Sequence, residues 1–500
     1  MGWARLLLAA AAGVLHALSF APFDLPWLQI VALAVLFALS ARLSSPRAAA
    51  ALGFAFGLGW FGFGVSWVYI SMHTYGLMPA PLAGAATAAF CAFLALYSAA
   101  ALGVAHWWCR PPTLRLALVL PACWTLSEWL RGTLLTGFPW LAGGYAHTDG
   151  PLAGFAPLVG VYGVGLFAAI LAGALAVLAV PIPVRGARAY LWIGATAVAI
   201  LSGGGIAGQL RWTKPAGAPI RVALVQANIP QDAKFTVEGL RSAFSEHWLL
   251  MLQTRADLVA LPESVFPVPL GLVPEQAIDA FHDYARKRGS ALIFGVFIEE
   301  PGQAFYNSAV GWSPQRPEWQ RYSKQHLVPF GEFIPWGFRW FVDRMQMPIG
   351  DQQHGGNAQP PMALAGQRVS VNICYEDLFG DVIRSAWRSP TPPTMMLNMS
   401  NLAWFDDSIA LPQHLQISRM RALETQHPML RATNTGVTAI IDAHGKVTAA
   451  LPTLTAGVLE GTAQGYEGRT PFIRYGNAPA LAASALMLLL AVALARLRPA

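Results

Sequence analysis

The feature that most constrains this chain is a series of eight apolar stretches, each close to the length that a helix needs to cross a bilayer. A membrane-spanning helix requires about 20 mostly apolar residues. Seven stretches lie in the first 210 residues and one near the C-terminus: Trp3–Phe20, Leu25–Ala41, Ala49–Ile70, Pro79–Trp107, Leu114–Leu130, Leu152–Ile182, Ala189–Ala207 and Ala478–Leu497. The sequence therefore predicts a polytopic α-helical membrane domain of about eight transmembrane helices. The run of small and aromatic residues from Gly53 to Trp67 predicts close helix packing.

Charge is unevenly distributed along the chain. Charged residues make up 12% of the sequence, about half the share of a typical soluble domain. Residues 1–210 contain eight arginines, three acidic residues and no lysine, whereas residues 211–474 contain 23 acidic and 23 basic residues. The middle section is therefore expected to form an extramembrane domain of neutral formal charge. Because it has no basic stripe, we expect no nucleic-acid partner.

Arginine positions orient the predicted spans. Nine arginines fall on one side of the membrane if all eight stretches cross it: Arg5, Arg42, Arg47, Arg110, Arg115, Arg185, Arg188, Arg496 and Arg498. Cytoplasmic loops carry the excess of basic residues, so we expect both termini in the cytoplasm and the charged section outside it. On the outer side, Arg131 is expected to form an interfacial ion pair with Glu128, which lies three residues earlier.

Between residues 220 and 465 the pattern changes to short strand-like runs that alternate with helical stretches. The expected strands are Arg221–Gln226, Leu258–Leu261, Ala291–Phe297, Ser308–Trp312, Arg368–Ile373, Thr394–Leu397 and Gly436–Asp442. The expected helices are Val237–Thr254, Pro274–Arg288 and Leu411–Leu423. Strands interleaved with helices indicate an α/β layered domain. Most of these strands are apolar on both faces, which indicates sheets that are covered on each side.

Cys374 is the only cysteine in this charged section, because Cys91, Cys109 and Cys123 lie within or beside the apolar stretches. A lone cysteine in an exterior domain is either buried and inert or a reactive nucleophile. Cys374 directly follows an expected strand, and a nucleophile on a sharp turn at a strand end is well exposed to substrate. The histidines of this section show no metal-ligand spacing, so we expect neither a metal nor another cofactor.

A thiol nucleophile needs a base, and attack on an acyl carbonyl needs a partner for the oxyanion. Glu263 follows another expected strand, and Lys324 is one of only five lysines in the chain. Spacing alone does not join Glu263, Lys324 and Cys374 into a triad, because surface charges would give the same pattern.

Three segments together resemble the Glu-Lys-Cys signature of the nitrilase, or carbon-nitrogen hydrolase, superfamily: Leu261–Glu263, Lys324–Glu332 and Cys374–Glu376. With its apolar stretches, essentially the whole chain resembles the apolipoprotein N-acyltransferases of bacterial inner membranes. Further matching segments are Gly137–Trp140, Asn401–Asp407, Met420–Glu424 and Arg431–Gly436.

The resemblance implies an architecture and a location. Residues 1–210 would form seven transmembrane helices, residues 220–465 a periplasmic nitrilase-like αββα sandwich, and residues 478–497 the last transmembrane helix. The protein would be a monomer in the inner membrane.

The resemblance also implies a two-step acyl transfer. Glu263 would deprotonate Cys374, and the thiolate would attack the sn-1 ester of a phospholipid, phosphatidylethanolamine by family analogy. Lys324 would stabilise the oxyanion. The α-amine of a diacylglyceryl-cysteine at the start of an apolipoprotein would then take the acyl group from the thioester, completing lipoprotein maturation.

Several further residues are expected to support this chemistry. Glu332 and Glu376 would orient the lysine and the cysteine or accept structural hydrogen bonds, and the backbone amide of Tyr375 would donate to the oxyanion. Trp404, Phe405 and Glu424 are candidates for substrate binding, and Phe333–Met347 for contact with the bilayer.

The sequence leaves two other classes of function open. A membrane-tethered amidase would use the same triad but pass the acyl group to water. A transporter would require broken helices or inward-facing charges, of which Glu128 is the only hint.

Overall fold

The computed structural model describes residues 2–180, 187–232, 237–301, 304–337, 339–340, 351–357 and 359–496. The chain divides into two compact units. The helical unit comprises Met1–Tyr69, Met78–Leu210 and Arg474–Ala500, and the α/β unit comprises Ile70–Leu77 and Arg211–Ile473. The predicted contact of Phe333–Met347 with the bilayer falls largely outside the described residues.

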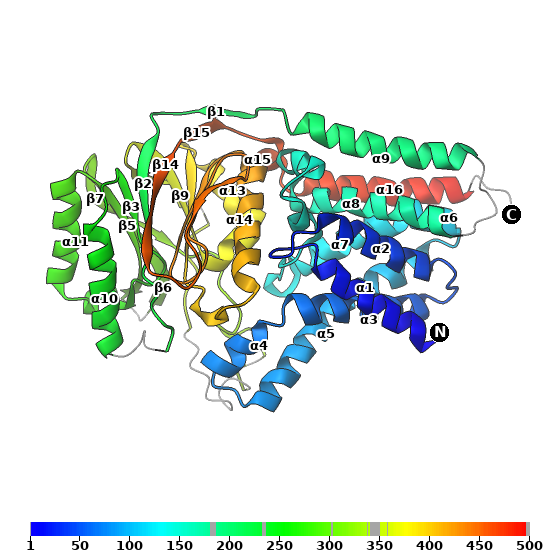
Figure 1. Cartoon of the computed structure of the whole chain (residues 1–500), viewed down its shortest axis with the longest axis horizontal. Helices are drawn as coiled ribbons and strands as arrows, with labels where there is room; N and C mark the ends of the chain where they lie inside the picture. The colour runs from blue at the N-terminus through cyan, green and yellow to red at the C-terminus, as the bar shows by residue number, and fades with distance from the viewer. Residues whose placement is uncertain are drawn as a thin grey trace. The chain divides into compact units, whose positions relative to one another are not determined.

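The helical unit contains a helix at each of the eight predicted apolar stretches (Figure 1). These helices are α1 (Trp3–Ala17), α2 (Pro26–Ser40), α3 (Pro46–Gly64), α5 (Ala80–Trp108), α7 (Leu120–Arg131), α8 (Ala156–Ala179), α9 (Ala187–Ala207) and α16 (Ala478–Arg496). Among the described residues, three are long and apolar enough to cross a membrane, or four if α3 and the segment Val68–Tyr75 count as one span despite a 63° bend. The number of spans therefore stays a prediction.

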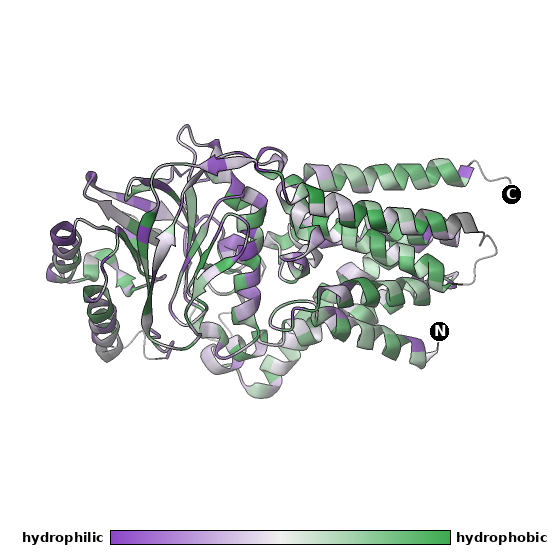
Figure 2. Ribbon diagram, turned by 45° about the horizontal axis from the view of Figure 1, so that its top comes forward, coloured by the Kyte–Doolittle hydropathy of each residue, from purple (hydrophilic) through white to green (hydrophobic). Residues whose placement is uncertain are grey.

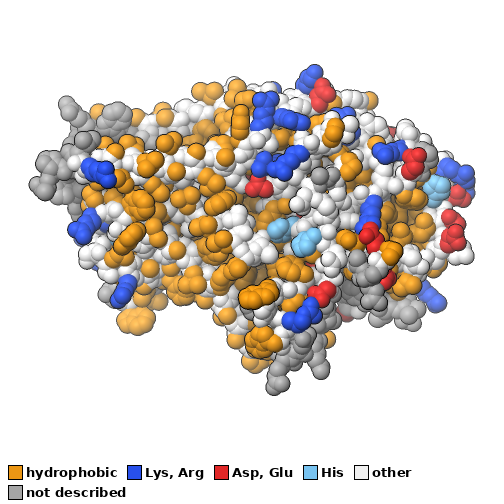
Figure 3. Space-filling view, turned by 180° about the vertical axis from the view of Figure 1, so that it is seen from behind, with side chains coloured by type: hydrophobic (Ala, Val, Ile, Leu, Met, Phe, Trp, Pro, Cys, Tyr) orange, Lys and Arg blue, Asp and Glu red, His pale blue; other side chains and the backbone are white. Residues whose placement is uncertain are grey.

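The helices of the helical unit consist mostly of hydrophobic residues (Figure 2), and hydrophobic side chains cover much of the face of this unit that Figure 3 shows. Leu191, Leu486 and Leu489 are 70%, 65% and 65% exposed. An apolar surface of this extent marks contact with a nonpolar partner, and here a bilayer fits. In contrast, charged side chains gather over the α/β unit (Figure 3).

Glycines allow α3 to lie against its neighbours, as the small-residue run predicted. A Cβ on Gly59 would lie 2.0 Å from the carbonyl oxygen of Ala10 in α1, and one on Gly53 would lie 2.4 Å from that of Ser98 in α5. Backbones this close exclude any larger residue at these two positions.

The α/β unit is built on two main sheets. The seven-stranded sheet contains β2 (Ile220–Gln226), β3 (Leu258–Ala260), β4 (Phe266–Pro269), β5 (Ala291–Glu300), β6 (Ala304–Ser313), β7 (Arg316–Ser323) and β14 (Gly457–Ala463). The six-stranded sheet contains β8 (Met362–Leu364), β9 (Gln367–Ile373), β10 (Met395–Ser400), β11 (Met429–Thr433), β12 (Ala439–Ile441) and β13 (Val447–Ala450). A short antiparallel pair, β1 (Thr213–Pro215) and β15 (Tyr466–Gly468), forms a third sheet.

Alternate residues along one strand belong to two different cores. Val222 and Leu224 of β2 pack with residues of β9 such as Val371, between the sheets. Ala223 and Val225 belong to the core on the other face. This period of two is the signature of a strand that is covered on both sides.

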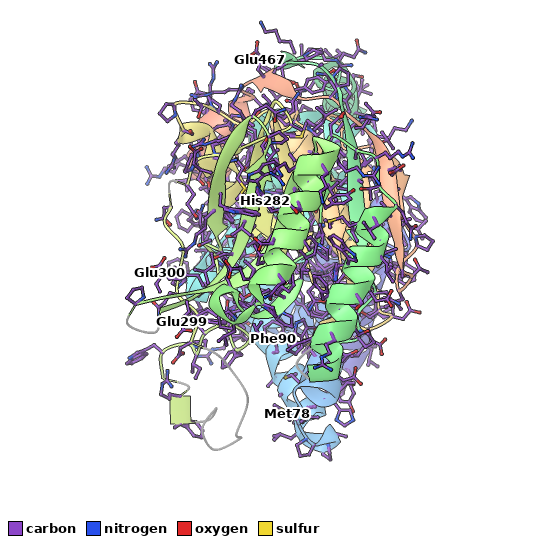
Figure 4. The ribbon with its side chains drawn as sticks, turned by 90° about the vertical axis from the view of Figure 1, so that its left-hand side faces the viewer. Met78, Phe90, His282, Glu299, Glu300 and Glu467 are labelled. Atoms are coloured by element: carbon purple, nitrogen blue, oxygen red, sulfur yellow. The ribbon has the colours of Figure 1, made fainter. Side chains whose placement is uncertain are left out.

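Helices cover the outer face of each sheet. The helices α10 (Val237–Leu252) and α11 (Glu275–Arg288) cover the first sheet, as Figure 4 shows with His282 labelled on α11. The helices α13 (Gly380–Ser385) and α14 (Ala410–Thr425) pack on the second sheet. The predicted αββα sandwich is confirmed.

Parallel pairing in both sheets brings strand ends together. In the first sheet β2, β3 and β5 are parallel neighbours, and in the second β9, β10 and β11 are. The carboxyl ends of parallel strands meet at one edge of a sheet, where α/β proteins place their sites. Cys374 follows β9, and Glu263 follows β3 by three residues.

Candidate active site

Cys374 lies on a strained turn between β9 and a one-turn 3₁₀ helix, Cys374–Leu378. Its φ angle is 52°, in the left-handed region that a residue with a Cβ rarely adopts. Ser264, next to Glu263, has a φ of 53°. Strain of this kind concentrates at functional sites, where the surrounding fold must hold it. Cys374 as a whole residue is partly exposed.

Lys324 lies between two carboxylates. Its Nζ donates to Glu332 Oε1 at 2.7 Å and lies 3.8 Å from Glu263 Oε1. The Lys324 side chain is 1% exposed, and both glutamates are buried. Burial opposes the charged form, but the two carboxylates outweigh it and raise the pKa of Lys324 above its usual value. The lysine is therefore a buried ammonium ion held by two carboxylates.

Asparagine and backbone groups hold the two carboxylates in place. The Asn307 Nδ2 donates to Glu263 Oε1 at 2.7 Å and to Glu332 Oε1 at 3.2 Å. The backbone amide of Asn401 donates to Glu263 Oε2 at 2.8 Å, and that of Val328 to Glu332 Oε2 at 2.8 Å. Both oxygens of each glutamate therefore accept hydrogen bonds, which fixes where each carboxylate points.

Desolvation raises the pKa of the Cys374 thiol well above its ordinary value, and the Glu263 carboxylate raises it further. Lys324 opposes this shift only in part. At neutral pH the thiol thus carries its proton and needs a base at the moment of attack. Glu263 is in electrostatic contact with both Cys374 and Lys324, as that role requires.

Glu376 connects the segment that follows Lys324 (Gln325 and His326, here called the lysine loop) to the turn at Cys374 (the cysteine turn). Its Oε1 accepts from the amides of Gln325 and His326 at 2.6 Å and 3.1 Å, and its Oε2 accepts from the amide of Ile373 at 2.7 Å. The hydroxyl of Tyr322 donates to the same carboxylate at 2.9 Å. Glu376 is fully buried, and burial raises its pKa to about 7 against these donors.

The expected substrate-binding residues lie in different settings. Trp404 is 40% exposed, and its carbonyl accepts from Ser71 Oγ at 2.8 Å. Phe405 is half-buried in the same short 3₁₀ turn, Ala403–Phe405, shortly after Asn401. Glu424 is fully buried and pairs with Arg421 at 2.7 Å, so it presents no surface to a substrate.

Glu128 and Arg131 are both buried and hold the segment that follows α7. The amide of Gly143 donates to both oxygens of Glu128 at 3.1 Å and 3.2 Å. Arg131 Nη1 donates to the carbonyls of Phe138 and Trp140 at 2.6 Å and 2.7 Å. Where an interfacial ion pair was expected, the structure thus shows two buried side chains that each bind backbone groups of the following segment.

Sequence reasoning missed several polar residues around the triad. Asn307 carried no signal, because a single asparagine in a strand has no motif. Asn401 lay inside a segment quoted only for its resemblance. Asp377, His414 and Arg431 form a buried network behind Cys374 and were not singled out.

Among the described residues, no group of three or more metal-ligating side chains occurs. The charged groups of the site pair with one another: the Lys324 ammonium lies between the carboxylates of Glu263 and Glu332.

The chain is similar to known proteins over almost its whole length. Residues 221–471 match the family model described as carbon-nitrogen hydrolase, and residues 12–174 match the apolipoprotein N-acyltransferase N-terminal domain. The proteins named apolipoprotein N-acyltransferase from Ralstonia nicotianae and Bordetella bronchiseptica are 51% and 43% identical to this chain. The alignments cover 97% and 99% of this chain, and 92% and 97% of those proteins. Among solved structures, the C. elegans NitFhit protein is similar at 16% identity, covering 57% of this chain and 66% of that one, with a TM-score of 0.41.

The family match over residues 221–471 and the αββα sandwich define a carbon-nitrogen hydrolase domain. The N-terminal match and the full-length relatives narrow this class: the chain belongs to the apolipoprotein N-acyltransferase family. With its apolar helices, it is a bacterial membrane protein.

Proposed function

We propose that this protein transfers a fatty acyl chain from a phospholipid, through a thioester on Cys374, to the N-terminal diacylglyceryl-cysteine of apolipoproteins. The names of its relatives supply the reaction class. The observation that carries the mechanism is the buried Lys324 held between Glu263 and Glu332 beside Cys374.

In the first half-reaction Glu263 takes the proton of the Cys374 thiol as sulfur attacks the ester carbonyl, for which we propose the sn-1 ester of phosphatidylethanolamine. Lys324 and the Tyr375 amide stabilise the oxyanion that forms. When the tetrahedral state collapses, the ester C–O bond breaks, the proton passes to the departing alkoxide, and lysophospholipid leaves. The acyl group remains on sulfur.

In the second half-reaction the α-amine of the acceptor attacks the thioester. Glu263 accepts a proton from the amine, the oxyanion forms again beside Lys324, and the C–S bond breaks. The amide product leaves, and Cys374 regains its proton. Glu332 positions Lys324 throughout, and Glu376 holds the lysine loop against the cysteine turn.

The partly exposed Trp404 and Phe405 are proposed to line the entrance for the acyl chains. Their turn begins two residues after Asn401, whose amide donates to Glu263. This connection supports a lipid entrance near the proposed base. Glu424 is better explained as a structural partner of Arg421.

A product assay tests this function against the amidase alternative. The purified protein is incubated with phosphatidylethanolamine and a synthetic diacylglyceryl-cysteine peptide, and the mass of the peptide is measured by mass spectrometry. We expect an added acyl group with wild type and with Cys91→Ala, a matched change in the helical unit, and none with Cys374→Ala. Release of free fatty acid without a modified peptide would instead identify a hydrolase.

A further inference from the structure

A buried polar network lies behind the cysteine turn and takes no part in the chemistry described above. It consists of Asp377 after the turn, Asn398 in β10, His414 and Ser418 in α14, and Arg431 in β11, each at most 1% exposed. Burying ionic groups is costly, and a well-packed apolar cluster is often at least as stable. Stability alone therefore explains the network poorly.

The network ends on the backbone of the nucleophile. Asn398 Nδ2 donates to the carbonyl oxygen of Cys374 at 3.1 Å and to Asn372 Oδ1 at 2.7 Å. Asn398 Oδ1 accepts from Ser400 Oγ at 2.5 Å and from Arg431 Nη1 at 3.4 Å. Asn398 thus holds the carbonyl group of Cys374 and is itself bound by Arg431.

The partners of His414 determine its protonation. Arg431 Nη2 lies 3.0 Å from His414 Nδ1, and Asp377 Oδ1 lies 2.8 Å from Nε2. A guanidinium can only donate, so Nδ1 must be the acceptor and the proton must sit on Nε2. Burial lowers the pKa of His414, which agrees with a neutral ring. His414 therefore donates its one N–H to Asp377 and accepts from Arg431, and so holds both charged groups in place.

Holding the Cys374 carbonyl also fixes the next amide group. The peptide unit is planar and trans, so the carbonyl of Cys374 and the N–H of Tyr375 point in opposite directions. The left-handed φ of Cys374 leaves this turn dependent on its surroundings for its conformation.

We propose that Asn398, through its hydrogen bond to the Cys374 carbonyl, and His414, through Arg431, are positioning residues that fix the peptide plane between Cys374 and Tyr375 and so aim the Tyr375 amide at the oxyanion. This inference rests on the proposed function, in which that amide stabilises the tetrahedral state. It assigns His414 and Asp377 the task of holding Arg431, which binds Asn398.

Two reactions of Cys374 separate positioning of the amide from general damage to the turn. Acylation by phosphatidylethanolamine forms an oxyanion. Alkylation by iodoacetamide does not, since sulfur displaces iodide at a saturated carbon and the thiol proton goes to the base. Single-turnover rates of both reactions are measured by mass spectrometry at Cys374 in the full-length protein, with Asn398→Leu, His414→Phe and His414→Gln.

For Asn398→Leu and His414→Phe we expect acylation to fall about 10- to 100-fold, the scale expected when a catalytic group is misplaced by about 1 Å. Alkylation should stay within about twofold of wild type, and His414→Gln, which keeps a donor near Nε2, should recover much of the acylation rate. The matched control is His427→Phe, at another buried histidine of the same unit, which should leave the ratio of the two rates unchanged.

Wild-type acylation rates in Asn398→Leu and His414→Phe would overturn the proposal and leave the proposed function intact. An equal fall of acylation and alkylation would also overturn it, because the network would then only maintain the turn. A wild-type protein that alkylates but never acylates would contradict the proposed function itself.

Discussion

Lys324 is the residue on which both half-reactions depend, because each passes through an oxyanion beside it. We expect Lys324→Met to slow thioester formation and thioester discharge alike, by about 10² to 10³, the usual effect of removing one oxyanion donor. Lys324→Arg should restore little, because a planar guanidinium does not fit between Glu263 and Glu332 as a compact ammonium does. Single-turnover kinetics of each half-reaction is the measurement. Wild-type rates in Lys324→Met would make the lysine a bystander.

Glu376 gives the fold a pH dependence at the residue scale. Burial raises the pKa of its carboxyl from 4.5 to about 7 in the folded protein. A raised pKa means that the folded state favours the protonated acid, so this contribution to stability is complete below about pH 4.5 and is lost as pH rises through about 7. Glu376→Gln should therefore reduce the fall in unfolding temperature between pH 5.5 and pH 8.5. Thermal unfolding at both pH values checks this, and an unchanged pH dependence would contradict it.

At the scale of elements, the close contact of α1 and α3 should tolerate no side chain at its centre. A Cβ on Gly59 would lie 2.0 Å from the backbone of Ala10, so Gly59→Ala should destabilise the helical unit by about 1–3 kcal/mol through overpacking. Gly62 lies in the same helix with nothing within 4 Å of an added Cβ, so Gly62→Ala should be neutral or stabilising by up to about 1 kcal/mol. Thermal unfolding in detergent compares them, and equal effects would refute the packing argument.

The elements of the α/β unit were predicted where apolar residues form a strand-like run or recur at a helical spacing. The helices α11 and α14 lie within about one to two residues of their expected bounds, and β2, β3 and β9 each differ from theirs by about one residue at one end. The strands β7 and β14 were missed because each is partly exposed and mixed in polarity. Likewise β11 was missed because its buried Arg431 interrupts the apolar run.

The candidate site was also predicted only in part. Cys374, Glu263 and Lys324 were singled out through strand ends and a superfamily signature, both of which are local in sequence. Asn307 and His414 were not, because their roles arise from contacts between elements that only the fold brings together. The burial of Glu376 could not be predicted either, since a glutamate after a strand is usually a surface charge.

At the scale of the whole molecule, the arginine pattern predicts both termini in the cytoplasm, the α/β unit in the periplasm and eight spans in the inner membrane. Reporter fusions test this: a fusion near Ser290 should report the periplasm, and one in the loop near Arg42 should report the cytoplasm. A cytoplasmic signal near Ser290 would contradict the proposed topology. The proposed monomer is checked separately by the mass of the detergent-solubilised protein.

The central claim is that Cys374 carries the acyl group between donor and acceptor, and intact-protein mass spectrometry tests it most directly. After incubation with phosphatidylethanolamine alone, the account predicts a mass increase of one acyl chain on Cys374, removable by hydroxylamine and lost on adding a diacylglyceryl-cysteine peptide. Cys374→Ser should form its adduct very slowly or not at all, since a hydroxyl is a far weaker nucleophile than a thiol. An undiminished, hydroxylamine-labile adduct in Cys374→Ala would contradict the account.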